Sequence, residues 1–193
     1  MIVPAGPSPA EVHVLFEGYI GEHTACTVAL IRDGEAAIVW DPGMVPLQGI
    51  ILEPLGRHGV EPQAVTDVIL SHHHPDHTMN VGLFPNARVH DHWAWYRGDL
   101  WVTRPAEGFE VSPSVRLLET PGHTPQCITT VAGTREGAVA LTHLWWTSEG
   151  PPEDPYATDP PALHDGRERV LQIADLIVPG HGAMFPPTDA TPR

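Results

Sequence analysis

Side chains that could bind a metal ion are concentrated in one short segment, His72-His73-His74-Pro75-Asp76-His77. The segment directly follows an apolar stretch, residues 64–70, that predicts a strand. Pro75 predicts a loop, which could turn several imidazole and carboxylate groups toward one point. Imidazole nitrogen and carboxylate oxygen suit zinc, with iron or manganese as alternatives. We therefore expect a metal site here that holds one or two zinc ions.

Three histidines far along the chain lie where they could complete this site. They are His123 in a Thr-Pro-Gly-His-Thr segment, His143 in Leu-Thr-His-Leu, and His181 in Pro-Gly-His-Gly. Each follows a predicted strand or a turn of small residues, where a side chain can enter a cleft at the strand ends. Other histidines are interpreted as surface residues or hydrogen-bonded core residues: His13, His58, His90 and His164. His73 is expected to point away from the metal if both of its neighbours are ligands.

The elements that must position these side chains follow from the hydrophobic pattern. In the first half, strands are predicted at 12–20, 26–31, 36–40 and 64–70, with a helix at 46–58. In the second half, strands are predicted at 87–90, 115–119, 126–132, 138–141 and 175–178, with helices at 91–96 and 161–174. Two β-rich halves with helices predict two sheets packed face to face with helices outside.

The length of 193 residues predicts one domain over 1–193, with its core at about 12–186. The first ten residues are interpreted as a loose lead-in, and residues 186–193 as a frayed tail. Cys26 and Cys127 are interpreted as buried free thiols.

The net charge of the chain indicates which classes of partner it can bind. Ten Lys and Arg residues against 24 Asp and Glu residues give a formal net charge of −14. Such a surface repels polyanions and anionic lipid, so a small-molecule substrate is favoured over nucleic acid. No apolar run approaches the roughly 20 residues that span a bilayer, and the start has no basic signal-peptide region. We therefore expect a cytoplasmic protein without a membrane partner; a homodimer is compatible with the sequence.

The order of these motifs resembles the metallo-β-lactamase superfamily. His-x-His-x-Asp-His after a strand is followed by Thr-Pro-Gly-His and then by a Gly-His-Gly turn. The earlier turn Trp40-Asp41-Pro42-Gly43 resembles the aspartate-glycine turn of that superfamily. Residues 80–85 and 173–182 resemble, more closely, the small metallo-β-lactamase domain-containing protein 1 group.

The resemblance implies an α+β fold, a four-layer αββα sandwich of the metallo-β-lactamase type. It also implies two sets of metal ligands. The first set would be His72, His74 and His123, and the second would be Asp76, His77 and His181. Asp41 would orient a ligand histidine from behind, or it would serve only as a turn residue before Gly43.

One position departs from the superfamily pattern. Members usually carry, at the end of the strand before Thr142-His143, an aspartate that bridges both metals. A neutral imidazole offers one lone pair, so His143 can serve only one metal. We favour ligation of one metal by His143. It could instead hydrogen-bond a water or substrate, accompany a single tightly held metal, or have rotated away with loss of activity.

The chemistry expected from such a site is hydrolysis. A metal-bound hydroxide would attack a small-molecule ester, thioester or lactone, and Asp76 would be catalytic by orienting the water or accepting its proton. The alternatives are a phosphodiesterase or ribonuclease of the same fold, and a non-hydrolytic iron-dependent oxygenase or metal-binding protein.

The loops expected to select the substrate are 94–108 and 147–161. Four aromatic residues suggest a rim for the pocket, or else core or a dimer interface: Trp93, Trp95, Tyr96 and Trp101. Trp145 and Trp146 could form an apolar wall of the pocket, or could be core.

Overall fold

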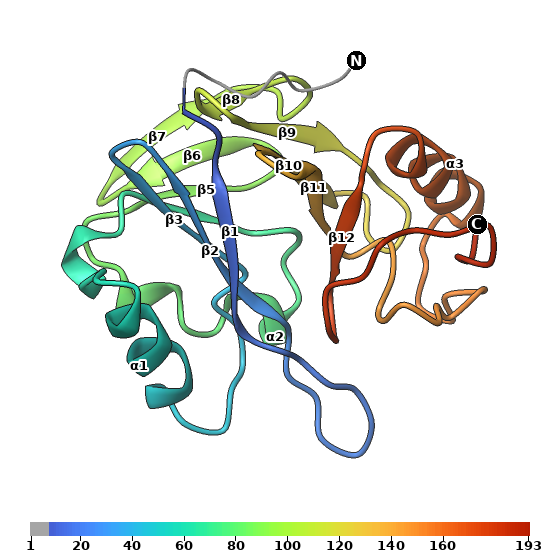
Figure 1. Ribbon diagram of the computed structural model, residues 1–193, viewed down its shortest axis with the longest axis horizontal. Coiled ribbons are helices and arrows are strands. Elements are labelled where there is room, and N and C mark those ends of the chain that lie inside the picture. The colour runs from blue at the N-terminus through green and yellow to red at the C-terminus, as the bar shows by residue number, and fades with distance from the viewer. Residues whose placement is uncertain (1–7) are drawn as a thin grey trace.

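The structure is a computed structural model that describes residues 8–193. Two β-sheets face each other, and helices cover their outer faces (Figure 1). Most of the predicted lead-in lies outside the described residues. Within the described part, the loose lead-in ends by Ala10, which is buried and whose backbone N–H donates to the carbonyl of Gly133.

The first sheet has seven strands, which follow one another in chain order. They are β1 (Glu11–Phe16), β2 (Val28–Asp33), β3 (Ala36–Trp40), β4 (Asp67–Ile69), β5 (Arg88–His90), β6 (Ala94–Arg97) and β7 (Leu100–Thr103). Strands β3, β4 and β5 are parallel, whereas the pairs on either side of them are antiparallel. The carboxyl ends of β3, β4 and β5 therefore meet at one edge.

The second sheet has five strands in the order β12-β11-β10-β9-β8. They are β8 (Glu110–Ser112), β9 (Val115–Glu119), β10 (Ile128–Thr134), β11 (Gly137–Thr142) and β12 (Leu176–Pro179). β10 is antiparallel to both β9 and β11, and β12 is parallel to β11. The strands β9, β11 and β12 therefore run in the same direction, so their carboxyl ends also share one edge.

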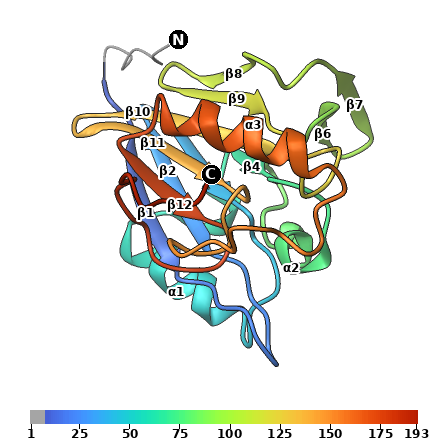
Figure 2. The ribbon, with the colours of Figure 1, turned by 90° about the vertical axis from the view of Figure 1, so that its right-hand side faces the viewer.

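Apolar side chains hold four layers together. Between the sheets, residues of both pack in one buried cluster, among them Ile31, Ile38, Trp40, Leu117, Ile128 and Leu141. Helix α1 (Gly49–Arg57) packs Ile51 and Leu55 on the outer face of the first sheet. Helix α3 (Pro160–Leu171) lies against the second sheet, as Figure 2 shows. Its Leu163 and Val170 pack on the outer face of that sheet. The predicted αββα sandwich is therefore confirmed.

Three short helical segments complete the described elements. They are α2 (Pro75–Thr78) and the 3-10 turns η1 (Pro62–Ala64) and η2 (Val81–Leu83). Helix α2 corrects the prediction of a loop after Pro75. Proline is compatible with the first helical position, because its missing N–H would have no partner there.

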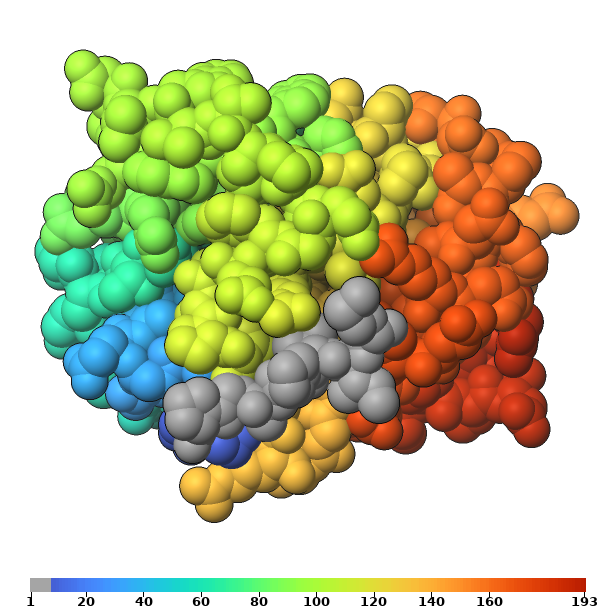
Figure 3. Space-filling model, turned by 90° about the horizontal axis from the view of Figure 1, so that it is seen from above, coloured from blue at the N-terminus to red at the C-terminus, as the bar shows by residue number. Residues whose placement is uncertain are grey.

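The predicted helix at 91–96 is wrong, because residues 94–96 belong to β6, which pairs with β7 as a hairpin, and residues 91–93 form no helix. Aromatic residues favour strands, and Gly98 adopts a positive φ of 61° in the connecting turn. Neither β7 nor β8 was predicted. In the view of Figure 3, the yellow-green chain around β8 lies between the blue-to-green and the orange-to-red parts of the chain.

The chain end is packed rather than frayed, which corrects the prediction for 186–193. The indole Nε1 of Trp145 donates to the carbonyl of Pro192 at 2.8 Å, and Thr191 is buried. Arg193 forms an ion pair with Glu168 of α3 at 3.0 Å. Over residues 8–193, no helix is both long and apolar enough to cross a membrane.

Candidate metal centre

The histidines singled out in the sequence meet at one edge of the sandwich. Asp41 follows β3, His72 follows β4, His123 follows β9, His143 follows β11 and His181 follows β12. Because these strands run in parallel within each sheet, their carboxyl ends place the following residues side by side. The topology therefore gathers side chains from both halves of the chain into one centre.

One group of ring nitrogens converges around His74. The Nδ1 atom of His74 lies 3.0 Å from Nε2 of His72 and 3.0 Å from Nε2 of His123. His72 and His123 are buried, whereas His74 is exposed and lines the cavity described below. These are the three residues that the sequence predicted for the first metal.

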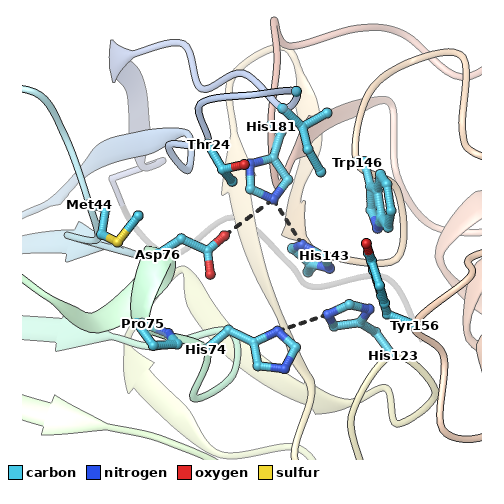
Figure 4. A pocket seen from close by; sticks show the side chains of 12 residues that line it. Thr24, Met44, His74, Pro75, Asp76, His123, His143, Trp146, Tyr156 and His181 are labelled. Carbon is cyan, nitrogen blue, oxygen red and sulfur yellow. Dashed lines mark hydrogen bonds and ion pairs between the residues drawn. The ribbon is translucent and has the colours of Figure 1, made fainter.

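A second group converges around Asp76 and His181. The Oδ2 atom of Asp76 lies 3.3 Å from Nε2 of His77. It also lies 3.6 Å from Nε2 of His181, as Figure 4 shows. Nε2 of His143 lies 3.2 Å from Nε2 of His181. The predicted second set is therefore also brought together, and His143 adjoins it.

Helix α2 is held in place by the turn after β3. The backbone N–H of Met44 donates to the carbonyl of Asp76 at 2.9 Å. A Cβ atom on Gly43 would lie only 1.6 Å from that same carbonyl oxygen. Glycine is therefore required at 43 so that the turn can approach the helix that carries Asp76 and His77.

Asp41 fixes the orientation of two histidine rings, one directly and one through Ser71. Its Oδ2 accepts from Nδ1 of His77 at 2.7 Å and from the hydroxyl of Ser71 at 2.6 Å, and its Oδ1 accepts from the Ser71 backbone N–H. The Ser71 hydroxyl can then accept from Nδ1 of His72 at 2.9 Å. Asp41 adopts a φ of 47°, a conformation that aspartate tolerates better than most residues. With a proton on each Nδ1 atom, the neutral form of each ring directs its Nε2 lone pair to the centre.

Two further buried histidines, His123 and His181, also use Nδ1 for a hydrogen bond to an acceptor outside the group of ligands. Nδ1 of His123 donates to Oδ2 of Asp154 at 2.7 Å, and Nδ1 of His181 donates to the carbonyl of Ala25 at 3.0 Å. Asp154 was missed by sequence reasoning, because it lies in a proline-rich loop 31 residues from its partner. Its only sequence signal is a carboxylate in a loop expected to lie near the site.

His143 lies in the middle of the centre. Its ring centroid is 4.5 Å from that of His72, 4.7 Å from His77 and 4.3 Å from His123. A Cβ atom on Gly180 would lie 2.4 Å from its Cδ2, so glycine at 180 makes room for the ring. The alternative in which His143 rotates away is therefore wrong. Among the described residues its buried Nδ1 has no hydrogen-bond partner.

The pKa values of two buried rings suit metal ligation, whereas His77 must release a proton to bind a metal. Burial and the neighbouring histidines hold the pKa values of His72 and His143 well below the usual range, so both are neutral at pH 7. Burial raises the pKa of Asp76, but His77 outweighs it and lowers that pKa to about 2. Burial also lowers the pKa of His77, which Asp41 and Asp76 nevertheless raise to about 9.

Several features together fit bound cations. Nitrogens bound tetrahedrally at about 2.0–2.1 Å from an ion lie about 3.3 Å apart, close to the separations found in both groups. His143 belongs to both sets of three histidines, His72-His123-His143 and His77-His143-His181, whose ligand atoms lie within 4.8 Å of one another. Nε2 of His77 is buried and makes no hydrogen bond with the described residues. A cation would satisfy these converging lone pairs.

Two histidines of the sequence analysis lie outside the centre, as predicted. Nε2 of His73 lies 3.2 Å from Asp91, so this side chain pairs away from its neighbours. His90 is fully buried, with Nε2 at 2.8 Å from Asp67. His90 is therefore a hydrogen-bonded core residue.

A cavity of about 500 Å³ opens onto the metal-binding groups. His74, Asp76, His123, His143 and His181 line it, with apolar residues around them. The predicted aromatic rim is not there, because none of Trp93, Trp95, Tyr96 and Trp101 lines this cavity. Trp145 is fully buried core, whereas Trp146 does line the cavity, together with Tyr156 of loop 147–161.

The fold and these convergent ligands define a class that sequence comparison also identifies. The model of the Metallo-beta-lactamase superfamily matches residues 21–190, and the chain belongs to this superfamily. Within it, the chain is 34% identical to metallo-beta-lactamase domain-containing protein 1 of Xenopus laevis, over 92% of this chain and 82% of the relative. The Homo sapiens protein of that name is 33% identical, over 96% of this chain and 71% of the relative.

Solved structures share the fold at lower sequence identity. A metallo-beta-lactamase-type protein of Thermotoga maritima superposes with a TM-score of 0.74 at 22% identity, covering 93% of this chain and all of that one. An N-acyl homoserine lactone hydrolase, with its product bound at the catalytic metal centre, gives 0.67 at 22%, with 94% of each chain covered. A protein in a di-iron-bound form gives 0.66 at 21%, with 89% and 94% covered.

Proposed function

We propose that this chain is a metal-dependent hydrolase that cleaves a small-molecule ester, thioester or lactone. The observation that carries the proposal is the convergence of two groups of ligand atoms beside a cavity of about 500 Å³. Membership in the superfamily supports it, as does the shared fold with a lactone hydrolase that has a catalytic metal centre.

In this proposal, His72, His74 and His123 hold one cation, and Asp76, His77 and His181 hold another. Divalent cations there would polarise the substrate carbonyl and lower the pKa of bound water. Zinc suits these nitrogen and oxygen ligands, and iron or manganese are alternatives. His143 binds one of the two cations, because its neutral ring offers a single lone pair.

Asp76 orients the attacking water. Its carboxylate lines the cavity, and its pKa of about 2 keeps it ionised at pH 7. An ionised carboxylate accepts a hydrogen bond well, but with so low a pKa it is a weak base near neutral pH. Of the two roles expected for Asp76, orienting the water is therefore favoured over accepting its proton.

A small molecule suits the cavity better than RNA does. Among the described residues that line it, none is Lys or Arg, and the chain carries a formal net charge of −14. A phosphodiester backbone is bound chiefly by such cationic side chains. We therefore expect no chelator-sensitive cleavage of single-stranded RNA. Cleavage that a chelator abolishes would favour the ribonuclease alternative.

The test is hydrolysis of p-nitrophenyl acetate by chelator-treated protein before and after zinc, manganese or iron(II) is added back. We expect activity to disappear with the chelator and return with at least one of these ions. His123→Ala should lose activity, while Asp165→Asn, on an exposed position of α3, should keep it. Hydrolysis that is unchanged by metal removal would refute the proposal, and so would oxygen consumption with iron but no hydrolysis of any ester, thioester or lactone.

A further inference from the structure

One wall of the cavity is a pair of stacked aromatic rings. The rings of Trp146 and Tyr156 lie 5.7 Å apart with an interplanar angle of 16°. In Figure 4 they stand beside His123 and His143, on one side of the pocket. Tyr156 is 68% exposed. Its free face is therefore available to a ligand.

The carboxylate of Asp154 accepts hydrogen bonds both from this aromatic wall and from His123. Oδ2 of Asp154 accepts from Nδ1 of His123 at 2.7 Å and from the indole N–H of Trp146 at 3.3 Å. Oδ1 accepts from the backbone N–H of Tyr156 at 2.9 Å. Asp154 is buried, so these contacts are shielded from competing water. One side chain thus sets the position of both rings relative to His123.

Arg167 of α3 fastens the loop that carries the wall. This buried guanidinium donates to the carbonyl of Leu144 at 2.8 Å, of Pro151 at 2.8 Å and of Pro152 at 2.7 Å. The chain on both sides of Trp146 is therefore held by the body of the protein. A ligand that packs on the wall does not have to order it, which reduces the entropic cost of binding.

Apart from the uncharged Thr24, the rest of the cavity lining is apolar or belongs to the metal-binding groups. Ile20, Met44 and Pro75 face the same space, and Asp76 is its only carboxylate among the described residues. Within residues 8–193, no Lys or Arg lines the cavity to pair with an anionic group of the ligand away from the metals. Removing such a charge from water without a partner is unfavourable.

We propose that the Trp146–Tyr156 wall is the subsite for an uncharged, apolar acyl chain, and that Asp154 sets its position relative to His123. This inference rests on the proposed function, because the metal centre would hold the carbonyl of the same substrate. It narrows the substrate class to neutral acyl compounds.

Hydrolysis of a matched pair of substrates tests the charge preference. p-Nitrophenyl hexanoate and mono-p-nitrophenyl adipate have acyl chains of equal length but differ by a terminal carboxylate. The wild type should hydrolyse the neutral ester with a kcat/KM at least about tenfold higher, from the desolvation of the unpaired charge. Equal kcat/KM values, or a preference for the adipate, would overturn the inference.

Tyr156→Ala tests the wall itself, and its exposed position makes loss of folding unexpected. It should raise KM for the hexanoate by about three- to tenfold, with little change in kcat, because a ring contact is lost. The effect on p-nitrophenyl acetate, which has a much shorter acyl chain, should be clearly smaller. Trp101→Ala, an exposed indole on β7, should leave both esters unaffected. An equal effect of Tyr156→Ala on acetate and hexanoate would overturn the assignment.

Asp154→Asn tests the positioning role, since it keeps the shape but removes the charge. It should both weaken metal binding in a chelator competition and raise KM for hexanoate relative to acetate, whereas Asp165→Asn should do neither. A variant with weaker metal binding but an unchanged hexanoate-to-acetate KM ratio would overturn the link between His123 and the wall.

A binding experiment separates this inference from the proposed function. Calorimetric titration with N-butylhexanamide, which is uncharged and resistant to hydrolysis, needs no catalysis. Binding that is weakened by Tyr156→Ala supports the wall, even if no ester is cleaved and the proposed function fails. Absence of binding to a protein that hydrolyses p-nitrophenyl acetate would overturn the wall alone.

Discussion

Asp41 is the residue on which the geometry of two histidines depends. It accepts hydrogen bonds from His77 and from both donors of Ser71, which in turn meets His72. Asp41→Asn keeps the size of the side chain and tolerates the same backbone conformation. It places an amide donor or a weaker acceptor against these groups, so we expect metal affinity to fall about 10- to 100-fold. Competition with a chromogenic chelator measures this change.

Asp165→Asn is the matched control for this variant, because it removes the same charge from an exposed position of α3. It should leave metal affinity at the wild-type value. If Asp41→Asn also binds metal as the wild type does, Asp41 is only a turn residue, and the orientation of His72 and His77 has another origin.

His143 is expected to determine how many cations the centre binds. A bridging carboxylate can bind two cations and reduces the repulsion between ions about 3.5–4 Å apart, whereas a neutral imidazole does neither. His143→Asp should therefore bind about one more equivalent of metal per chain after dialysis against a metal buffer. Elemental analysis of the dialysed protein gives the count. Two equivalents in both proteins would show that His143 does not limit the second site.

At the scale of elements, an ion pair between the buried Asp67 and the partly exposed Arg88 links β4 to β5. Oδ1 of Asp67 accepts from Nε of Arg88 at 2.8 Å and lies 2.8 Å from Nε2 of His90. Burial raises the pKa of Asp67, but the hydrogen bonds from His90 and Arg88 outweigh it, and the pKa is lowered. The folded state thus favours the ionised form. This stabilisation is present above the unfolded pKa near about 4 and is lost as the pH falls through the lower folded pKa.

Asp67→Asn should therefore lower the free energy of unfolding at pH 7 by about 1–3 kcal/mol. The difference from the wild type should shrink below about pH 4, where the wild-type carboxylate is protonated as well. Urea unfolding of both proteins from pH 7 to pH 3 provides the measurement. A difference that stays constant over this range would mean that the charge of Asp67 contributes nothing.

Elements were predictable from the sequence where one local pattern decides the structure. The strands at β3 and β9 have the bounds predicted, because apolar and β-branched residues dominate them. The segment 91–96 was misassigned, since its spacing of aromatic residues also fits a helix, and only pairing with β7 selects the strand. Short elements such as α2 and β8 carry too few residues for a periodic pattern.

The residues of the site likewise include some that were predictable from the sequence and some that were not. The ligands were predictable because histidines follow strand ends in a recognisable order. Asp154 and Tyr156 were not, because their loop has no periodic pattern and is held by Arg167 and His123 from other parts of the fold. His143 was visible as a departure from the superfamily pattern, but its central position depends on the space beside Gly180.

At the scale of the whole molecule, two sheets each bring parallel strand ends to one edge, and the ligands meet where those edges face each other. The −14 net charge of the chain contrasts with a centre in which histidine rings converge and, among the described residues, no Lys or Arg lines the cavity. Bound metal would add positive charge to this centre, so the proposed function depends on metal occupancy.

The amount of transition metal bound per chain therefore tests the central claim most directly. The protein is purified without added chelator, dialysed, and measured by inductively coupled plasma mass spectrometry beside the double variant His72→Ala/His77→Ala. The wild type should retain at least about one equivalent of a divalent transition metal, and the variant should retain almost none. A wild type that holds less than about a tenth of an equivalent, even after incubation with zinc, manganese or iron(II), would contradict the account.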